Sequence, residues 1–377
     1  MSVTFPWKRP SIVGLAALAL VGAGTSAFAQ TAAPAPAADT DAGPPKNLSV
    51  GSEGLFQPGL LMQTWLLVDH VGRSADPTQS TFRLRRAEVH VKGDILPHQV
   101  KYEVMFDVAK VLEFQNATLT DSNGDTITVQ QPASSISVLQ DFSITYSSQY
   151  ADVTAGQFKI PVSWEGYNSS SKLLFNERAV VSHTFGDKRD IGVKVTKKFP
   201  KWSYYAGVFN GAGLNHRDNN DGKDLAVRLE VYPVPGLTIA GVTYDQIGDR
   251  DLAGTKDRWE GDVRYESGPL LLQSEFIRGR DGQGGGMSVN SQGFYVAGGF
   301  KLPMATGELQ PALRVGYFDP NADGDAPASK DEVLEIGAAA NYYLEGREAR
   351  MSFSYTRFQY DQADPVDEVI LGAQVAY

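Results

Sequence analysis

The residues best suited to chemistry in this sequence are bases in and before one polar stretch, 156–195. These bases are Arg85, Arg86, Lys159, Lys172, Arg178 and Arg189. The bases of the stretch are interleaved with the acids Glu165, Glu177, Asp187 and Asp190. Arginine suits oxyanions because its planar fork donates paired hydrogen bonds, and fixed charges can replace the water that an ion loses in a narrow passage. The bases could form an ion filter, pin a loop through ion pairs, or lie on a solvated surface loop.

Patterns for catalysis and metal binding are weaker. The chain has no cysteine, its five histidines form no H-E-x-x-H pair, and it has no G-x-S-x-G elbow. The Gly-rich run 281–286 follows a strand pattern and precedes no helix, which predicts a flexible loop and not a phosphate cradle. Segment 319–330 begins like a calcium loop, but Lys330 stands where a glutamate is needed, so calcium there stays open. We assign no catalytic, cofactor or metal site.

The N-terminus has the pattern of a secretory signal peptide over 1–29. Lys8 and Arg9 form its charged region, and Ala27-Phe28-Ala29 matches a cleavage site. Residues 30–54 are rich in Ala and Pro, which predicts a flexible periplasmic leader. Loss of the signal removes two bases, so the exported chain is more acidic than its net charge of −10. Nucleic acid is therefore not an expected partner.

From residue 55 to 377 the sequence repeats a period-two pattern typical of strands. We count sixteen such segments, near 57–69, 81–93, 98–108, 135–147, 151–160, 189–198, 201–210, 223–233, 236–247, 256–267, 269–280, 291–302, 308–318, 332–344, 348–361 and 366–377. Short connections alternate with mostly long, polar ones such as 109–134, 161–188 and 281–290. An even strand count with this alternation predicts an all-β, transmembrane antiparallel β-barrel in the outer membrane, with its outer surface in lipid.

The two faces of the segments support a water-filled barrel. In the last segment Val369, Leu371 and Ala373 share one face, opposite Glu368 and Gln374. Apolar residues outside and polar residues inside reverse the arrangement of a small soluble barrel. The segment 81–93 changes phase near Arg85 and Arg86, and a β-bulge there would keep both arginines away from lipid.

The sequence resembles the phosphate-selective porin O and P family of bacterial outer-membrane channels. The matching positions are Arg85-Arg86; Gly156, Phe158, Lys159, Pro161 and Glu165; Ser169–Ser171; Phe175, Glu177 and Arg178; and Arg189, Asp190, Gly192 and Val193. The resemblance implies a sixteen-stranded, homotrimeric porin whose third external loop folds into the barrel. In this chain that loop is 161–188, and the six bases named first are the candidates for its constriction.

The resemblance implies passive diffusion of small hydrophilic solutes or inorganic anions, with phosphate as one candidate. Alternation, however, places both signs of charge on the inward faces, for example Arg228 and Arg264 beside Glu230 and Glu260. The sign of selectivity therefore stays open. Two alternatives remain, namely an outer-membrane enzyme with dispersed catalytic residues and an uptake channel specific for a sugar or an aromatic acid.

Overall fold

The computed structural model describes residues 48–50, 54–72, 78–96, 99–112, 114–120, 126–132, 137–218, 221–247, 254–323, 332–346, 348–361 and 363–377. The predicted signal peptide (1–29) and most of the predicted leader (30–54) lie outside these residues and stay predictions. A short strand, β1 (Leu48–Val50), lies within the leader range and pairs with the start of the first long strand.

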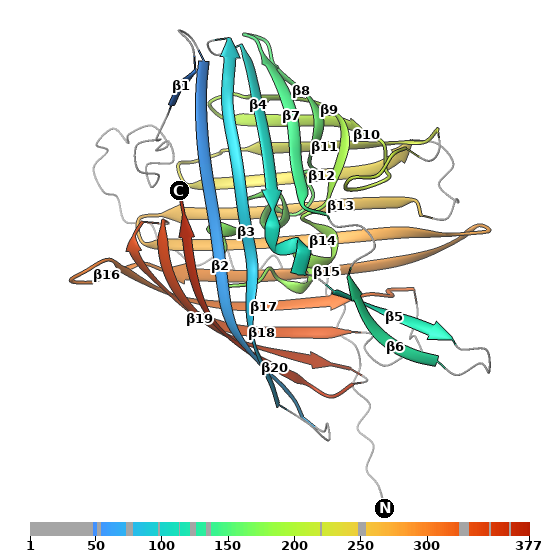
Figure 1. Ribbon diagram of the computed structural model, residues 1–377, viewed down its shortest axis with the longest axis vertical. Coiled ribbons are helices and arrows are strands. Elements are labelled where there is room, and N and C mark those ends of the chain that lie inside the picture. The colour runs from blue at the N-terminus through green and yellow to red at the C-terminus, as the bar shows by residue number, and fades with distance from the viewer. Residues whose placement is uncertain are drawn as a thin grey trace, which may run out of the picture. The chain divides into compact units, whose positions relative to one another are not determined.

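Sixteen long strands form a closed antiparallel barrel, in which strands consecutive along the wall pair and the last pairs with the first (Figure 1). They are β2 (Gly54–Val71), β3 (Thr78–Leu96), β4 (Val100–Asp107), β7 (Leu139–Ser147), β8 (Asp152–Lys159), β9 (Arg189–Lys198), β10 (Trp202–Phe209), β11 (Lys223–Val231), β12 (Leu237–Ile247), β13 (Lys256–Ser267), β14 (Leu270–Gly284), β15 (Met287–Phe300), β17 (Glu308–Asp319), β18 (Val333–Glu345), β19 (Ala349–Tyr360) and β20 (Val366–Ala376). Each predicted segment corresponds to one of these strands, so the predicted fold class is confirmed.

Two predicted loops contain strands. Within 109–134 the chain forms a separate hairpin of β5 (Phe114–Thr120) and β6 (Thr126–Pro132), after the 3-10 helix η2 (Val108–Leu112). The predicted loop 281–290 is wrong, because β14 and β15 continue through it and leave a two-residue turn at 285–286. A further short strand, β16 (Leu302–Pro303), pairs with the start of β17. Both ranges contain polar and glycine-rich runs typical of loops, namely 121–125 and 281–286, which is why the sequence indicated long connections there.

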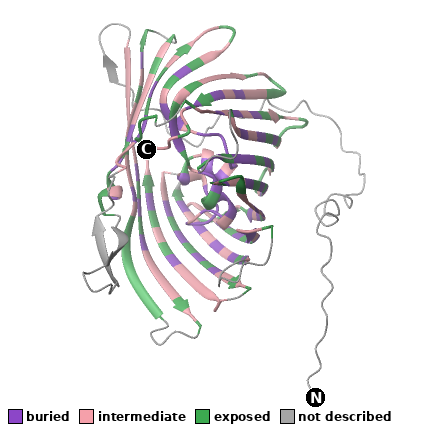
Figure 2. Cartoon of the chain, turned by 90° about the vertical axis from the view of Figure 1, so that its right-hand side faces the viewer, coloured by how far each residue is buried: buried purple, intermediate pink, exposed green. Residues whose placement is uncertain are grey.

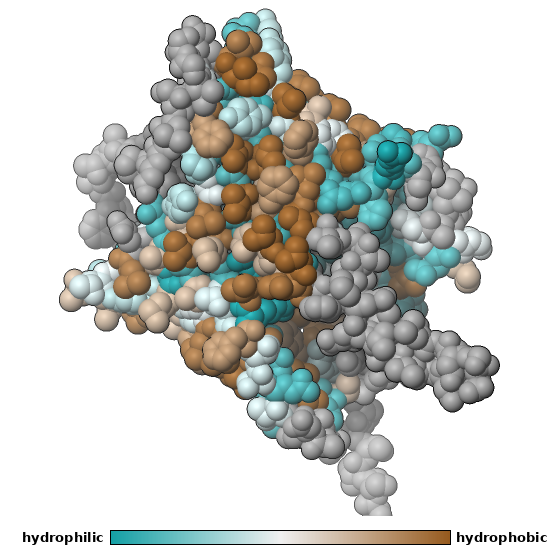
Figure 3. Space-filling view, in the orientation of Figure 1, coloured by the Kyte–Doolittle hydropathy of each residue, from teal (hydrophilic) through white to brown (hydrophobic). Residues whose placement is uncertain are grey.

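The outer face of the barrel is apolar. Phe82 is 84% exposed and Leu313 is 68% exposed, which are unusual values for large apolar side chains outside lipid. Hydrophobic side chains cover much of the face formed by β2, β3 and β4 (Figure 3). Among the described residues, no helix has the length and apolarity needed to span a lipid bilayer. The exposed stripes alternate with buried polar residues along the same strands, as a strand between lipid and water requires.

A β-bulge lies where β3 changes phase. Gln63 of β2 pairs with Arg86 and the next residue, Thr64, pairs with Leu84, so Arg85 is the extra residue. The bulge gives Arg85 and Arg86 side chains that are 9% and 4% exposed, while Leu84 stays on the lipid face. The predicted bulge is confirmed, and it directs two successive arginines into the barrel.

The loop 161–188 lies inside the ring of strands, where its short helices are seen among the wall strands (Figure 2). It contains α1 (Trp164–Tyr167), the 3-10 helix η3 (Ser170–Lys172) and α2 (Val180–Phe185). Ser163 caps α1 by accepting a hydrogen bond from Gly166 N at 3.0 Å. The loop connects β8 to β9, so both of its ends are fixed by neighbouring strands of the wall.

Candidate pore constriction

Aromatic side chains of the loop pack against glycines of the inner wall. A Cβ atom on Gly337 would lie 2.8 Å from the Phe175 ring, and one on Gly279 would lie 2.5 Å from the Phe185 ring. Phe185 also contacts Phe318 edge to face, with 5.8 Å between ring centroids. These contacts belong to a buried apolar cluster that joins the loop to the wall. Glycine is required at these wall positions because the loop approaches the strand backbone too closely for a side chain.

Buried carboxylates of the wall hold the loop backbone. Glu275 of β14 accepts a hydrogen bond from Glu165 N at 2.9 Å, and Glu335 of β18 accepts one from Val180 N at 3.0 Å. Glu165 in turn accepts from Ala179 N at 2.9 Å, which ties the two halves of the loop together. Burial raises the pKa of Glu165. The wall acids therefore act on the loop as backbone acceptors, in the way that a capping residue acts on a helix.

The middle of the loop is fixed at β18 and β19. Arg350 Nη1 donates to Leu173 O at 2.7 Å, and Asn341 Nδ2 donates to Leu174 O at 2.8 Å. Lys172, one of the six candidates, is the last residue of η3 and comes directly before Leu173. Lys172 therefore lies in the segment of the loop that is attached to β18 and β19, whereas Asp187 lies at the end of the loop next to β9.

Glu177 receives both arginines of the bulge. Arg85 Nε lies 2.8 Å from Glu177 Oε2, and Arg86 Nη2 lies 3.4 Å from Oε1. Gln63 fixes the other side of Arg86 by accepting from Nη1 at 2.7 Å. Burial alone would raise the pKa of Glu177, but Arg86 and Arg85 outweigh it and hold that pKa below its usual range. This contact joins the loop to β3, although 91 residues separate Arg86 from Glu177.

Asp187 joins three further candidates. Its carboxylate lies 2.8 Å from Lys159 Nζ, 3.1 Å from Arg178 Nη1 and 3.3 Å from Arg189 Nη1. Burial would raise the pKa of Asp187, but Lys159, followed by the two arginines, holds it well below its usual range. Asp187 has a positive φ of 56°, a conformation in which Asp and Asn are the common non-glycine residues. One carboxylate therefore organises bases from β8, from the loop and from β9.

The wall strands β7 and β3 add acids to this group of bases. Arg189 forms a bidentate pair with Asp141 of β7, at 3.1 and 3.2 Å, and Glu88 of β3 lies 4.0 Å from Arg86 Nε. Five of the six candidates thus meet four acids, Glu177, Asp187, Asp141 and Glu88. These ion pairs attach the loop to the wall, and a role of the same bases in filtering ions stays a prediction.

Sequence reasoning did not include Asp141 or Glu88 among the candidate site residues. Both stand on inward positions of the strand alternation, which is the signal that could have identified them. The partnership of Asp141 with Arg189 was hidden because 48 residues and a complete loop separate them.

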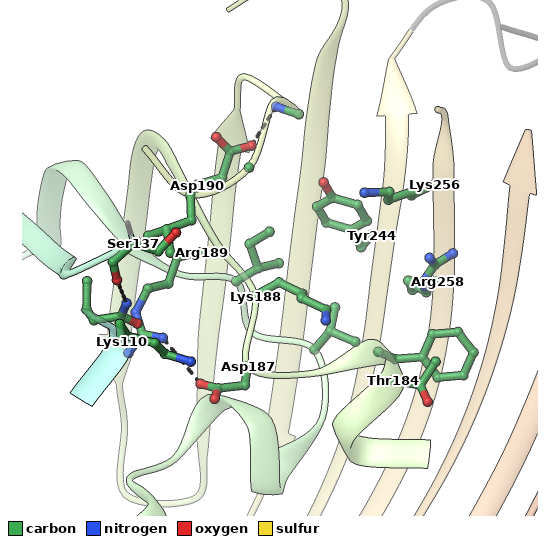
Figure 4. A pocket seen from close by; sticks show the side chains of 17 residues that line it. Lys110, Ser137, Thr184, Asp187, Lys188, Arg189, Asp190, Tyr244, Lys256 and Arg258 are labelled. Atoms are coloured by element: carbon green, nitrogen blue, oxygen red, sulfur yellow. Dashed lines mark hydrogen bonds and ion pairs between the residues drawn. The ribbon is translucent and has the colours of Figure 1, made fainter. Parts of the chain in front are cut away.

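A cavity of about 530 Å³ lies beside the constriction (Figure 4). Its lining includes Asp187 and Arg189, so the cavity borders the group of charges around Asp187. The rest of the lining comes from loops and strand ends at the side of the long connections, for example Leu214 and Lys256. In barrels of this type the long loops are external, and the cavity is then an external vestibule.

The predicted similarity of segment 319–330 to a calcium loop stays open. In the segment 319–330, Asp323 accepts hydrogen bonds from Asn290 N and Nδ2, both at 2.8 Å, and residues 324–330 lie outside the described part. Within the described ranges, no group of three His, Asp or Glu side chains is placed to hold a metal ion.

Comparison with known proteins gives a family match and a set of structural neighbours. The model of the family "Phosphate-selective porin O and P" matches residues 68–252 and 240–376. An uncharacterized protein of Aquifex aeolicus is 22% identical over 277 residues, which are 62% of this chain and 65% of that protein. The match therefore spans slightly less than two thirds of that relative's length.

The structural neighbours are outer-membrane barrels. An anion-selective porin from Comamonas acidovorans superposes with a TM-score of 0.58 at 10% identity, covering 86% of this chain and 100% of that one. The channel DcaP of Acinetobacter baumannii superposes with a TM-score of 0.57 at 13% identity, covering 88% of this chain and 99% of that one. The trimer form of OmpT from Vibrio cholerae superposes with a TM-score of 0.55 at 10% identity, covering 86% of this chain and 100% of that one. At these identities the likeness concerns the fold.

Proposed function

We propose a charge-selective constriction for this chain, which belongs to the phosphate-selective porin O and P family and is an outer-membrane channel. The constriction is the space between the loop 161–188 and the facing wall. Solutes pass by diffusion, and the charges around Asp187 and Glu177 act on them where the passage is narrowed. The protein carries out no reaction in this proposal.

The observation that supports charge selection is the convergence of five bases on two loop carboxylates. Arg85 and Arg86 face Glu177, while Lys159, Arg178 and Arg189 face Asp187. With Asp141 and Glu88 the group has five bases and four acids, which leaves one positive charge. We therefore propose a weak preference for anions, weaker than a pore lined with bases alone would give. Inorganic phosphate is one solute of this class, and the paired arginines suit it.

The test is the reversal potential of the purified protein in a planar bilayer across a KCl gradient, repeated with phosphate. We expect a potential of the sign that indicates chloride over potassium, and reduced current with phosphate. Arg86→Gln should weaken the anion preference, while Lys201→Gln, in the short turn between β9 and β10, should leave it unchanged. Cation selectivity in the unmodified protein would refute the proposal. A closed channel with hydrolase activity would replace it with the enzyme alternative.

We also propose that the channel is a homotrimer embedded in outer-membrane lipid. The trimer form of OmpT, a structural neighbour, supports this assembly, and the exposed apolar residues of the strands support the lipid contact. Native mass spectrometry of the detergent-extracted protein should show three copies of the chain. A monomer under the mildest extraction conditions would contradict the assembly.

A further inference from the structure

The external vestibule is more basic than the constriction beneath it. The described lining residues include five bases, Lys110, Lys188, Arg189, Lys256 and Arg258, and two acids, Asp187 and Asp190. Lys188 extends between the Asp187–Arg189 group and the strands that carry Tyr244, Lys256 and Arg258 (Figure 4). The vestibule therefore has a surplus of positive charge on the external side of the loop.

Both acids of the vestibule already have partners. Asp187 is shared by three bases of the constriction. Asp190 accepts backbone hydrogen bonds from Ile191 N at 2.7 Å and from Gly211 N at 2.6 Å. Asp187 acts on Lys188 but is shared with the three bases of the constriction, and backbone amides engage Asp190, so the two acids offset the five bases only in part. An added anion would be favoured at this position.

The charges of Lys188, Lys256 and Arg258 act on one another. Partial burial lowers the pKa of Lys188, and the like charges of Lys256 and Arg258 lower it further, against the opposite effect of Asp187. Arg258 is itself held by Asp281, at 2.6 Å, and by its own strand. The two lysines are exposed at the cavity and have long, adaptable side chains. They are therefore the groups that can close on a bound anion.

The other part of the lining is apolar and aromatic. It includes Ile160, Val162, Phe185, Leu214 and Tyr244. The Arg258 guanidinium lies 5.0 Å from the centre of the Phe185 ring, which orients that ring beside the bases. An inorganic ion would leave most of a cavity of about 530 Å³ to water, whereas pockets for organic ligands begin at roughly 300 Å³. Charge and apolar surface thus lie together in a space of ligand size.

We propose that this vestibule binds small aromatic carboxylates before they reach the constriction. The carboxylate lies between Lys188 and Lys256, and the ring lies against the side of the cavity formed by Phe185, Tyr244 and Leu214. This inference rests on the proposed function, because the bound solute would then pass the bases around Asp187. It names a solute class, an organic anion with an apolar body, that the constriction charges by themselves would not favour over an inorganic anion.

The test is a ligand-observed NMR titration of the full chain in detergent, with benzoate, acetate and phosphate as probes. Benzoate should bind about tenfold more tightly than acetate, because its ring buries apolar area that acetate lacks. Lys188→Gln and Lys256→Gln should each weaken benzoate binding about threefold to tenfold, since the cavity is partly open to water. Lys201→Gln is the matched control and should bind benzoate like the unmodified protein.

The same variants, and a double variant that combines Lys188→Gln with Lys256→Gln, are then compared in planar bilayers. External benzoate should reduce the chloride current of the unmodified protein, and this effect should be absent in the double variant. Equal affinity for benzoate and acetate would overturn the aromatic part of the proposal. Unchanged benzoate binding in the double variant would overturn the site itself. The titration does not depend on ion selectivity, so a cation-selective channel that still binds benzoate would refute the proposed constriction and leave the vestibule site standing.

Discussion

Asp187→Asn isolates the charge at the centre of the proposed constriction. Asparagine has the same shape and tolerates the positive φ of 56° at this position, so the loop backbone should keep its path. The substitution leaves Lys159, Arg178 and Arg189 without their shared carboxylate. Arg189 keeps Asp141, and Arg178 Nε keeps its hydrogen bond to Glu165 O at 2.9 Å. The expected change is therefore electrostatic.

Its size follows from Coulomb's law. For an ion passing at about 7 Å, one unit charge in water changes the energy by about 0.6 kcal/mol. Screening in about 0.1 M salt reduces this to about 0.3 kcal/mol. Loss of the negative charge of Asp187 favours chloride and disfavours potassium by this amount. The two effects add, so the chloride-to-potassium permeability ratio should rise about threefold.

The assay is the reversal potential in a KCl gradient, measured for the unmodified protein and for Asp187→Asn. Asp152→Asn is the matched control, because it removes the same charge at the other end of β8, beside a short turn. The control should leave the ratio unchanged. An unchanged or lower ratio in Asp187→Asn would refute the reasoning, since it would mean that ions do not pass within reach of this carboxylate.

Three further predictions concern Glu177, the pH dependence of the ion pairs and the bulge of β3. Glu177→Gln should lower the free energy of unfolding by about 1–3 kcal/mol and increase current noise, because it removes the carboxylate charge that Arg85 and Arg86 share. Urea unfolding and single-channel traces measure these two effects, and unchanged values of both would contradict the prediction. The lowered pKa values of Glu177 and Asp187 mean that their ion pairs are complete above the usual values of 4.5 and 3.8 and are lost only as pH falls through the lowered values. The shift in reversal potential that Asp187→Asn produces should therefore be the same at pH 7 and pH 5, and a shift that disappears at pH 5 would contradict the lowered pKa of Asp187. Deletion of Arg85 should remove the bulge and still give a folded barrel. Deletion of Arg83 should instead turn lipid-facing side chains of β3 on the external side of the bulge toward the lumen, and so impair folding. Heat-modified gel mobility measures the folded fraction of each variant, and equal folding of both would contradict the bulge assignment.

The strands and the bulge could be predicted from the sequence because their signals are local. Alternation between lipid-facing and water-facing residues is present within each segment, and the turns that end it are adjacent in the chain. The phase change at Arg85 and Arg86 is likewise contained in one strand, and it required a bulge to avoid an arginine in lipid. The strands β5 and β6 are short and are separated by the polar run 121–125, so the sequence predicted one long connection over their range.

The pairing of the charges depended on the closed barrel. Glu177 could reach Arg85 and Arg86 only after the loop folded inward across the ring, and Asp141 reached Arg189 because β7, β8 and β9 are neighbours in the wall. Local alternation is enough to predict that bases and acids face water inside a sixteen-stranded barrel. Which charges meet depends on the folded barrel, because barrel closure and loop packing bring together residues that have no local signal for one another.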